Sequence, residues 1–318
     1  MTRAKLALQE VIQLFIEGAG QVGYSGRFSD PNEVQKWVDV MVQHGQLAID
    51  TSRIYSEGTS EQLIAQLDLK GVRVDTKIFP VTPGDHAPSK LKELFKLSLE
   101  ALGSHKIRVF YLHAPDRSVP FEDTLEGVNE LYQQGHFEEL GLSNYMSFEV
   151  AEIVGICKRR GFVLPSVYQG IYNVLDRTNE AELFPCLRKF NIRGGFLTGK
   201  LLAPEPQVET GSHFDPNWAL SVFYTTRYSH TVSAVKELKD VADKHGLKLA
   251  EVAYRWLEHH SAMIPTDRGI ILGASRVEQL ESAILNCEKG PLPEEVVAAC
   301  AETWLKIKGN AKPSWQLT

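Results

Sequence analysis

Four residues in the first part of the chain could together transfer a proton: Asp50, Tyr55, Lys77 and His113. A tyrosine hydroxyl has an ordinary pKa of about 10, so alone it is a poor acid at neutral pH. A nearby lysine cation lowers that pKa, and an aspartate can pair with the lysine and fix its position. A histidine beside the tyrosine can orient a carbonyl oxygen or share the proton. Such a set is what the reduction of a carbonyl group requires when a nicotinamide supplies the hydride.

The positions of these residues give the set its weight, because each residue alone is weak evidence. An aspartate after a strand is more often a cap or turn residue, and a single tyrosine usually belongs to the core. Here Asp50, Lys77 and His113 each end a predicted strand, and Tyr55 lies five residues after Asp50. The carboxyl ends of parallel strands meet at one face of a barrel, where barrel enzymes have their active sites. The four side chains are therefore predicted to form one site.

The elements that must position these residues alternate regularly along the chain. Short apolar runs predict strands at 11–16, 47–50, 72–77, 107–113, 138–142, 164–169 and 269–273. Amphipathic patterns predict helices at 61–67, 89–102, 122–134, 149–160, 180–190 and 277–287. Gly161 is a C-cap signal that ends the helix at 149–160. Strands that alternate with helices are typical of right-handed βαβ units and a parallel sheet. No linker rich in Pro, Gly or Ser divides the 318 residues, so we expect one (β/α)8 TIM-type barrel over 1–318 rather than two domains.

The predicted strands leave the barrel one strand short. The regular spacing of predicted strands and helices places the missing strand after the helix that ends near Phe190. Only Asn191, Ile192 and Arg193 are available there before the double glycine at Gly194. One interpretation is a very short strand; the other is a deletion of about eight residues, more than a typical strand contains. The sharper prediction is a barrel that is incomplete or distorted at its seventh strand.

A glycine motif near the N-terminus suggests a different fold but has the wrong context. Residues 18–23 read GAGQVG, which matches the GxGxxG fingerprint of a dinucleotide-binding Rossmann unit. The fingerprint must open a helix, and residues 24–31 (YSGRFSDP) cannot begin one. A helix is predicted to start only near Pro31 or Asn32, with Asp30 as its N-cap. The motif is therefore interpreted as an ordinary loop.

Composition excludes several other classes of protein. The net charge of −6, from 34 basic and 40 acidic residues, leaves no basic excess for binding nucleic acid. The four cysteines contain no CxxC pair, which is typical of a reduced compartment and predicts neither a disulfide framework nor a zinc site. The chain shows no secretory signal and no run of 18 apolar residues, so we expect a cytoplasmic protein without a membrane segment.

Several segments resemble one protein family along most of the chain. They include AIDTSRIYSEGTSEQ (48–62), FYLHAPDRSVPFEDTL (110–125), ELGLSNYMSFEVAEI (139–153), GGFLTGK (194–200) and IILGASRVEQLESAI (270–284). These segments look like the aldo-keto reductase superfamily, and in particular its aflatoxin-aldehyde-reductase-like branch with fungal relatives. The resemblance implies a (β/α)8 barrel that binds NADPH in an extended pose without a Rossmann domain, in agreement with the rejection of the glycine motif.

The resemblance also implies a role for each site residue. Tyr55 would donate the proton, Lys77 would lower the pKa of that tyrosine, Asp50 would anchor the lysine and His113 would orient the substrate. The residues implied in cofactor binding are Ser143, Asn144 and Gln169 at the nicotinamide, a loop with Gly194, Gly195, Leu197, Gly199 and Lys200 over the pyrophosphate, and Gly273, Ser275, Arg276 and Gln279 at the 2′-phosphate and adenine. Because a guanidinium binds phosphate bidentately, Arg276 favours NADPH over NADH.

Three departures from the family pattern fall on this cofactor site. Relatives have an aromatic in a Tyr-Asn-Pro-Leu-type segment before the double glycine, whereas here Arg193 runs directly into Gly194. His213 stands where an arginine is usual, and Ala283 where an asparagine is expected. By analogy with base–aromatic stacking, losing one stacking aromatic costs about 1–3 kcal/mol. The set of proton-transfer residues is thus complete, while the cofactor-binding site is predicted to be impaired.

These observations lead to one leading hypothesis and two alternatives. The leading hypothesis is an NADPH-dependent reductase of a small aldehyde or ketone, acting as a monomer or homodimer. The first alternative is a barrel with impaired cofactor binding that serves as a binding or regulatory subunit. The second is a reaction without redox chemistry, with Tyr55 and His113 as acid and base. The substrate cannot be read from the sequence, because variable loops form the pocket.

Overall fold

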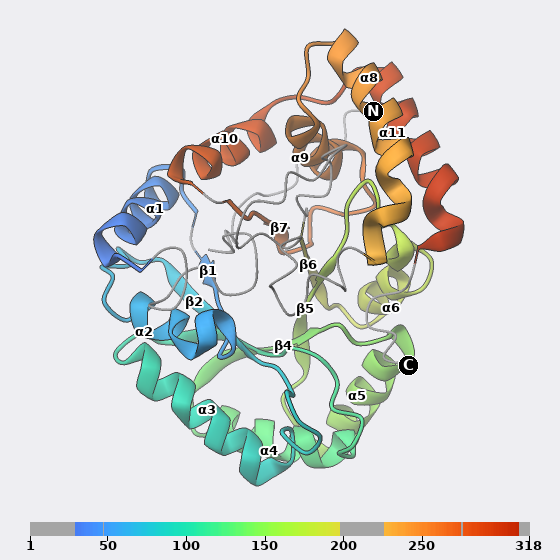
Figure 1. Cartoon of the computed structure of the whole chain (residues 1–318). Coiled ribbons are helices and arrows are strands. Elements are labelled where there is room, and N and C mark those ends of the chain that lie inside the picture. The colour runs from blue at the N-terminus through green and yellow to red at the C-terminus, as the bar shows by residue number, and fades with distance from the viewer. Residues whose placement is uncertain (1–28, 47, 198–225, 275, 312–318) are drawn as a thin grey trace.

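The strands form a single parallel sheet that curls around a central axis, with the helices on its outer side (Figure 1). The structure is a computed structural model that describes residues 29–46, 48–197, 226–274 and 276–311. Seven strands pair in chain order: β1 (Ala48–Asp50), β2 (Arg73–Ile78), β3 (Ile107–Leu112), β4 (Phe137–Ser143), β5 (Pro165–Ile171), β6 (Arg193–Leu197) and β7 (Gly269–Ile271). This α/β architecture is consistent with a TIM-type barrel.

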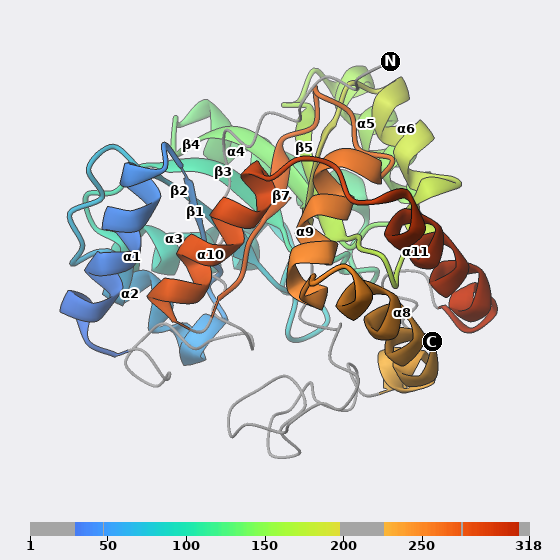
Figure 2. The same cartoon turned by 90° about the horizontal axis from the view of Figure 1, so that it is seen from above.

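The helices form the outer layer, and Figure 2 shows them from a second direction. They are α1 (Pro31–Gln43), α2 (Ser60–Ile64), α3 (Pro88–Leu102), α4 (Phe121–Gln133), α5 (Ser147–Arg160), α6 (Leu183–Lys189), α8 (Val232–Lys244), α9 (Leu249–His260), α10 (Val277–Glu288) and α11 (Glu294–Ile307).

Two predicted helix boundaries are confirmed. The Asp30 carboxylate accepts a hydrogen bond from the Asn32 amide at 2.9 Å, and α5 ends at Gly161, which has a left-handed φ of 69°. In the described ranges, no helix is long and apolar enough to cross a membrane.

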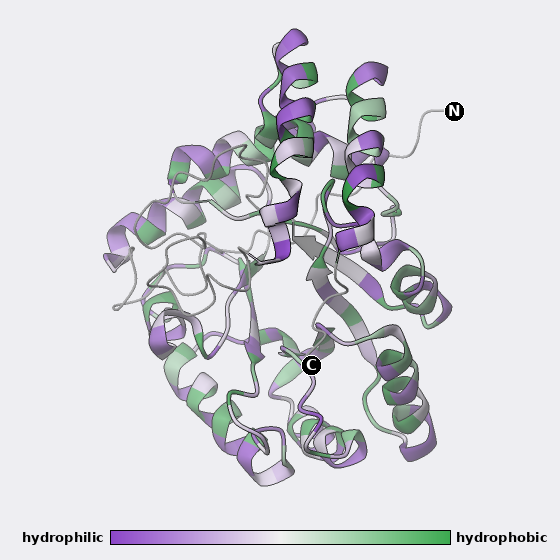
Figure 3. Cartoon of the chain, turned by 45° about the vertical axis from the view of Figure 1, so that its right-hand side comes forward, coloured by the Kyte–Doolittle hydropathy of each residue, from purple (hydrophilic) through white to green (hydrophobic). Residues whose placement is uncertain are grey.

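The hydrophobic residues bury themselves in two layers. Most of them pack between the strands and the helices. The helices carry both hydrophilic and hydrophobic residues along their length (Figure 3). A smaller group, Val109, Tyr111 and Val167, lies on the other side of the sheet, inside the curl. Gly141 packs directly against this inner group. A Cβ built at position 141 would overlap the ring of Tyr111. The ring therefore occupies the space that the missing side chain leaves.

A Gly141→Ala variant is expected to be destabilised by about 1–3 kcal/mol or more, since the added methyl must displace a fully buried ring. Urea unfolding would measure the loss. Gly155→Ala is the matched control, because Gly155 lies within α5 and a methyl added there would meet no atom within 4 Å apart from the backbone of its own helix and its chain neighbours. The control should be stabilised by about 0.5–1 kcal/mol, the ordinary gain of alanine over glycine in a helix. Equal stability of the two variants would contradict the packing described for Tyr111.

Two β-bulges direct polar side chains into this interior. The register between β2 and β3 shifts after Val74, and Arg108 makes two hydrogen bonds, of 2.9 and 2.7 Å, to the Asp75 carboxylate. The register between β4 and β5 shifts after Leu140, and Ser166 donates to Glu139 at 2.7 Å. Bulges commonly re-aim a side chain in this way.

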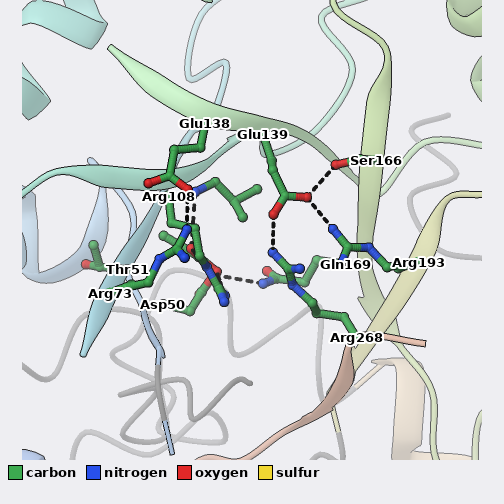
Figure 4. Close-up of polar contacts among 12 residues, drawn as sticks. Asp50, Thr51, Arg73, Arg108, Glu138, Glu139, Ser166, Gln169, Arg193 and Arg268 are labelled. Carbon is green, nitrogen blue, oxygen red and sulfur yellow. Dashed lines mark hydrogen bonds and ion pairs between the residues drawn. The ribbon is translucent and has the colours of Figure 1, made fainter. Parts of the chain in front are cut away.

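Glu139 also joins the ends of two strands that are distant in sequence (Figure 4). It accepts hydrogen bonds from Arg193 of β6 and, at 2.6 Å, from Arg268, which directly precedes β7. Burial alone would raise the pKa of Glu139, but hydrogen bonds from Ser166 and Arg268 and the charges of both arginines lower that pKa to about 2. The carboxylate thus remains charged and holds β6 and β7 together at neutral pH.

The predicted loss of a strand before the double glycine is wrong. Residues Arg193–Leu197 form β6, which pairs in parallel with both β5 and β7. The strand includes Gly194 and Gly195, because the ladder is made by backbone groups and needs no side chain. Polar contacts hold its start, since the Gly194 amide donates to Asp267 at 3.1 Å and its carbonyl accepts from the Arg268 amide at 2.7 Å. The chain therefore fills the gap with residues that the family resemblance assigned to a loop.

The strand predicted at 11–16 and the glycine motif at 18–23 lie outside the described residues. The described sheet has β1 and β7 as its edges. Helices α1 and α10, which belong to these two ends of the sheet, pack against each other. The outer layer therefore brings the two edge strands to the same side of the molecule, as a closed barrel requires.

Candidate active site

The fold brings Asp50, Tyr55, Lys77 and His113 together at the carboxyl ends of β1, β2 and β3. Asp50 ends β1, Lys77 lies next to the end of β2, and His113 directly follows β3. Tyr55 begins the short 3-10 helix η1 (Tyr55–Gly58) after β1. The Nζ atom of Lys77 lies 5.2 Å from the centre of the Tyr55 ring. The Tyr55 and His113 rings stand edge to face with their centres 5.8 Å apart.

Lys77 and Asp50 form a fully buried ion pair. Lys77 also donates to the Thr51 carbonyl at 2.9 Å, and the Gln169 amide donates to the other Asp50 oxygen at 2.8 Å (Figure 4). Burial lowers the pKa of Lys77 and raises the pKa of Asp50, while the attraction between the two charges opposes both shifts. Each partner therefore depends on the other to remain charged beneath Tyr55.

A second network holds the turn that presents Tyr55. Within that turn Ser56 and Glu57 have left-handed φ angles of 48° and 54°. Arg53 donates both to the Gly58 carbonyl and to the buried carboxylate of Glu61. Left-handed residues other than glycine persist only where surrounding contacts over-determine them, and they concentrate at functional sites. Sequence reasoning missed this network, because nothing in the spacing of its members marks them as partners.

His113 is held from three sides. Its backbone amide donates to the Ile78 carbonyl at 3.0 Å, and its own carbonyl accepts from the Asn144 side chain at 2.8 Å. Its Nδ1 lies 3.1 Å from the Ser52 hydroxyl, a contact that sequence reasoning also missed. Burial, the Lys77 cation and the nearby His86 hold the pKa of His113 well below its ordinary value of 6.5. The imidazole is therefore neutral at neutral pH.

The buried histidines predict a specific pH dependence of stability. Burial also lowers the pKa of His86, which lies in the loop before α3 and is completely buried. The unfolded chain binds protons at these histidines below about pH 6.5 while the folded chain does not, so stability is full above that pH and falls as the pH drops below it. Each group contributes a slope of up to about 1.4 kcal/mol per pH unit.

Urea unfolding of the wild type, His113→Gln and Gln133→Ala between pH 7.5 and 5 would measure this slope. We expect His113→Gln to show a shallower loss of stability, because one titrating group has been removed. Gln133 lies exposed at the end of α4 and does not titrate, so its replacement serves as the control and should leave the slope as it is. A slope that His113→Gln leaves unchanged would contradict the assignment.

The residues predicted at the nicotinamide end lie next to one another. Ser143 ends β4 and pairs in register with Gln169 of β5, which in turn pairs with Gly195 of β6. Asn144 follows with a left-handed φ of 64°, and its side chain also contacts the Ser143 hydroxyl at 3.1 Å. Gln169 has a further task that the sequence did not predict, because its amide nitrogen holds Asp50. The hydrogen-bonding side chains of Ser143, Asn144 and Gln169 thus lie together at the carboxyl ends of the strands, the end of the sheet where Tyr55 also lies.

The other predicted cofactor residues fall into three groups. Arg276 is exposed directly before α10, while Gln279 in the first turn of that helix and Gly273 before it are half-buried. A guanidinium beside a helix N-terminus is a suitable partner for a phosphate. The loop predicted over the pyrophosphate is wrong for Gly194, Gly195 and Leu197, since these lie in β6. The remaining predicted residues, Gly199, Lys200 and Ser275, lie outside the described residues. Within the described ranges no cluster of His, Cys, Asp or Glu could hold a metal ion.

Similarity to known proteins extends along nearly the whole chain. A sequence model described as the aldo/keto reductase family matches residues 15–305. An aldo-keto reductase of Pseudocercospora fijiensis is 41% identical over 87% of this chain and 99% of its own. Human aldo-keto reductase family 7 member A3 is 38% identical over 83% and 86%, and mouse aflatoxin B1 aldehyde reductase member 2 is 37% identical over 88% and 82%. The likeness therefore covers the complete sheet and its site rather than a single motif.

Proposed function

Since the chain belongs to the aldo/keto reductase family, we propose that it reduces a small aldehyde or ketone to the alcohol with NADPH, and that Tyr55 supplies the proton. The observation that carries this proposal is the buried Lys77–Asp50 pair beneath the Tyr55 ring, with His113 at the ring's edge. The similar mammalian proteins named aflatoxin B1 aldehyde reductases support an aldehyde as the class of substrate.

Each residue has a defined part in this reaction. NADPH, when bound, supplies the hydride that forms the new C–H bond at the carbonyl carbon. Tyr55 gives its hydroxyl proton to the carbonyl oxygen, so that one hydride and one proton convert C=O to CH–OH. The Lys77 cation stabilises the phenolate left on Tyr55, and Asp50 keeps that cation in place without exposing it to water. A proton then returns to Tyr55 from solvent before the next turnover.

The residues present suit the proposed cofactor. Amide and hydroxyl groups on Ser143, Asn144 and Gln169 match the donors and acceptors of a nicotinamide carboxamide. The exposed Arg276 at the start of α10 suits a 2′-phosphate and supports NADPH over NADH. Nothing in this set requires a Rossmann unit.

One observation favours a second candidate function. Residues 194–197, which the family resemblance assigns to the loop over the cofactor's pyrophosphate, lie in β6 instead. A barrel that binds cofactor weakly could serve as a binding or regulatory subunit. This candidate differs from the first in its affinity for NADPH and in turnover, and not in its fold.

Two measurements on the full chain separate these candidates. Quenching of protein fluorescence would give the Kd for NADPH and for NADH, and absorbance at the nicotinamide band would follow oxidation of NADPH with a panel of aldehydes. Reductase activity predicts micromolar or tighter NADPH binding, a weaker Kd for NADH, and turnover that Tyr55→Phe lowers by at least about 100-fold. Turnover no greater than that of Tyr55→Phe would reject the reductase, and aldehyde conversion without NADPH oxidation would indicate acid–base chemistry alone.

A further inference from the structure

Ser52 is a buried residue that joins the ends of β1, β2 and β3. It lies two residues after Asp50 and is completely buried. Its Oγ atom lies 3.0 Å from the backbone oxygen of Lys77 and 3.1 Å from Nδ1 of His113. The hydroxyl therefore connects the strand that carries the lysine with the imidazole at the edge of Tyr55.

The positions of the protons in this arrangement follow from counting donors. A serine hydroxyl has a single proton, and a backbone carbonyl oxygen can only accept one. If Ser52 donated to His113, two oxygen acceptors would face each other at 3.0 Å with no proton between them. The Ser52 proton therefore points to Lys77, and the Ser52 oxygen accepts a proton from Nδ1 of His113.

We infer that Ser52 fixes His113 as the tautomer with its proton on Nδ1, which makes Nε2 a hydrogen-bond acceptor in the active site. The imidazole is neutral, because burial and Lys77 keep the pKa of His113 low, so no second proton occupies Nε2. Among the described residues, no hydrogen bond to Nε2 is formed, and the ring is only partly buried. Tyr55 and Phe79 both meet this ring edge to face.

An acceptor at Nε2 changes which substrate the site prefers, and this step rests on the proposed reductase function. The lone pair of Nε2 repels a bare carbonyl oxygen but binds a hydroxyl proton. A substrate with a hydroxyl beside its carbonyl group can give the carbonyl oxygen to Tyr55 and the hydroxyl proton to His113. The substrate class that fits is therefore a 2-hydroxyaldehyde or 2-hydroxyketone. Ser52 acts through His113 as a positioning residue that determines specificity.

Ser52→Ala isolates this effect with little risk to folding. The Lys77 carbonyl still accepts a hydrogen bond from the Arg53 amide at 2.9 Å, so no buried acceptor loses its last partner. Ser60→Ala is the matched control, because it also removes a buried hydroxyl, one that lies 3.0 Å from Thr51 Oγ1 and does not contact His113. Both variants should retain the fold and NADPH binding.

The first readout is the tautomer itself, measured without substrate by NMR of protein with 15N-labelled histidine. Couplings between ring carbon-bound protons and the two nitrogens identify the protonated nitrogen, and a His113→Asn spectrum assigns the signals. We expect a proton on Nδ1 in the wild type and in Ser60→Ala, and a shift towards the Nε2-protonated form in Ser52→Ala. A wild type with its proton on Nε2 would overturn the inference.

The second readout is the ratio of kcat/KM for glycolaldehyde and propanal, which differ only in a hydroxyl in place of a methyl. Each value must be corrected for the free-aldehyde fraction. We expect the wild type and Ser60→Ala to favour glycolaldehyde at least about tenfold, and Ser52→Ala to lose most of that preference. An unchanged ratio in Ser52→Ala would overturn the specificity role. Absence of turnover with every carbonyl compound would reject the proposed function instead, and the NMR result would still decide the tautomer.

Discussion

A Tyr55→Phe variant is expected to lose about 10²- to 10⁴-fold in kcat for aldehyde reduction, the usual contribution of a positioned general acid. The substitution removes one oxygen and keeps the ring, which is 6% exposed and packs against His113. The carbonyl oxygen must then take its proton from water instead of from a positioned acid. Steady-state oxidation of NADPH with a saturating aldehyde would measure the loss.

The interpretation requires that the variant still folds and still binds cofactor. Its Kd for NADPH should therefore match that of the wild type. Tyr132→Phe is a suitable control, because it removes the same oxygen from α4, outside the site. If Tyr55→Phe keeps more than about a tenth of the wild-type kcat, the proton comes from another group.

Removal of one partner of the Lys77–Asp50 pair is expected to be the most destabilising change in the site. Both side chains are fully buried, so Asp50→Ala leaves an ammonium group without its counter-charge. Breaking a buried pair in this way typically costs about 3–5 kcal/mol, much more than the pair contributes when intact. Urea unfolding should show this loss for Asp50→Ala and for Lys77→Met.

The double variant Asp50→Asn, Lys77→Met separates stability from chemistry. It removes both buried charges while Gln169 can still donate to the side chain at position 50. We expect it to regain most of the stability that Lys77→Met loses, because no unpaired charge remains. It should nevertheless be as inactive as Tyr55→Phe, since no cation stabilises the phenolate. A double variant as unstable as the sum of Lys77→Met and the matched single variant Asp50→Asn would show that the pair is not coupled.

Some parts of the fold and the site could be predicted because they depend on local patterns. Alternation of apolar runs and amphipathic segments identified six of the strands that the structure describes, and the Asp30 cap and Gly161 end followed from local helix-capping rules. Asp50, Lys77 and His113 were expected to meet because parallel strands all end at one face.

The error at β6 shows the limit of such patterns. A double glycine ordinarily interrupts a strand, because glycine adds no side chain to pack and is entropically costly to order. The cost is overcome here by ladders on both sides and by partners far away in the sequence, since Asp267 and Arg268 hold Gly194, and Glu139 holds Arg193. No window of sequence contains these contacts.

The sequence by itself indicated the chemistry proposed for this protein: a cation, its counter-charge and an imidazole at the ends of strands, and an acid that follows the first of these strands. Only the tertiary structure decided how these groups are tuned. Gln169 meets Asp50 across 119 positions of sequence, and Ser52 meets His113 across 61. The physical reason is that strand register and burial select hydrogen-bond partners, and those partners decide where each proton lies. In the proposed reaction, the positions of the protons would in turn determine which carbonyl compounds the site recognises.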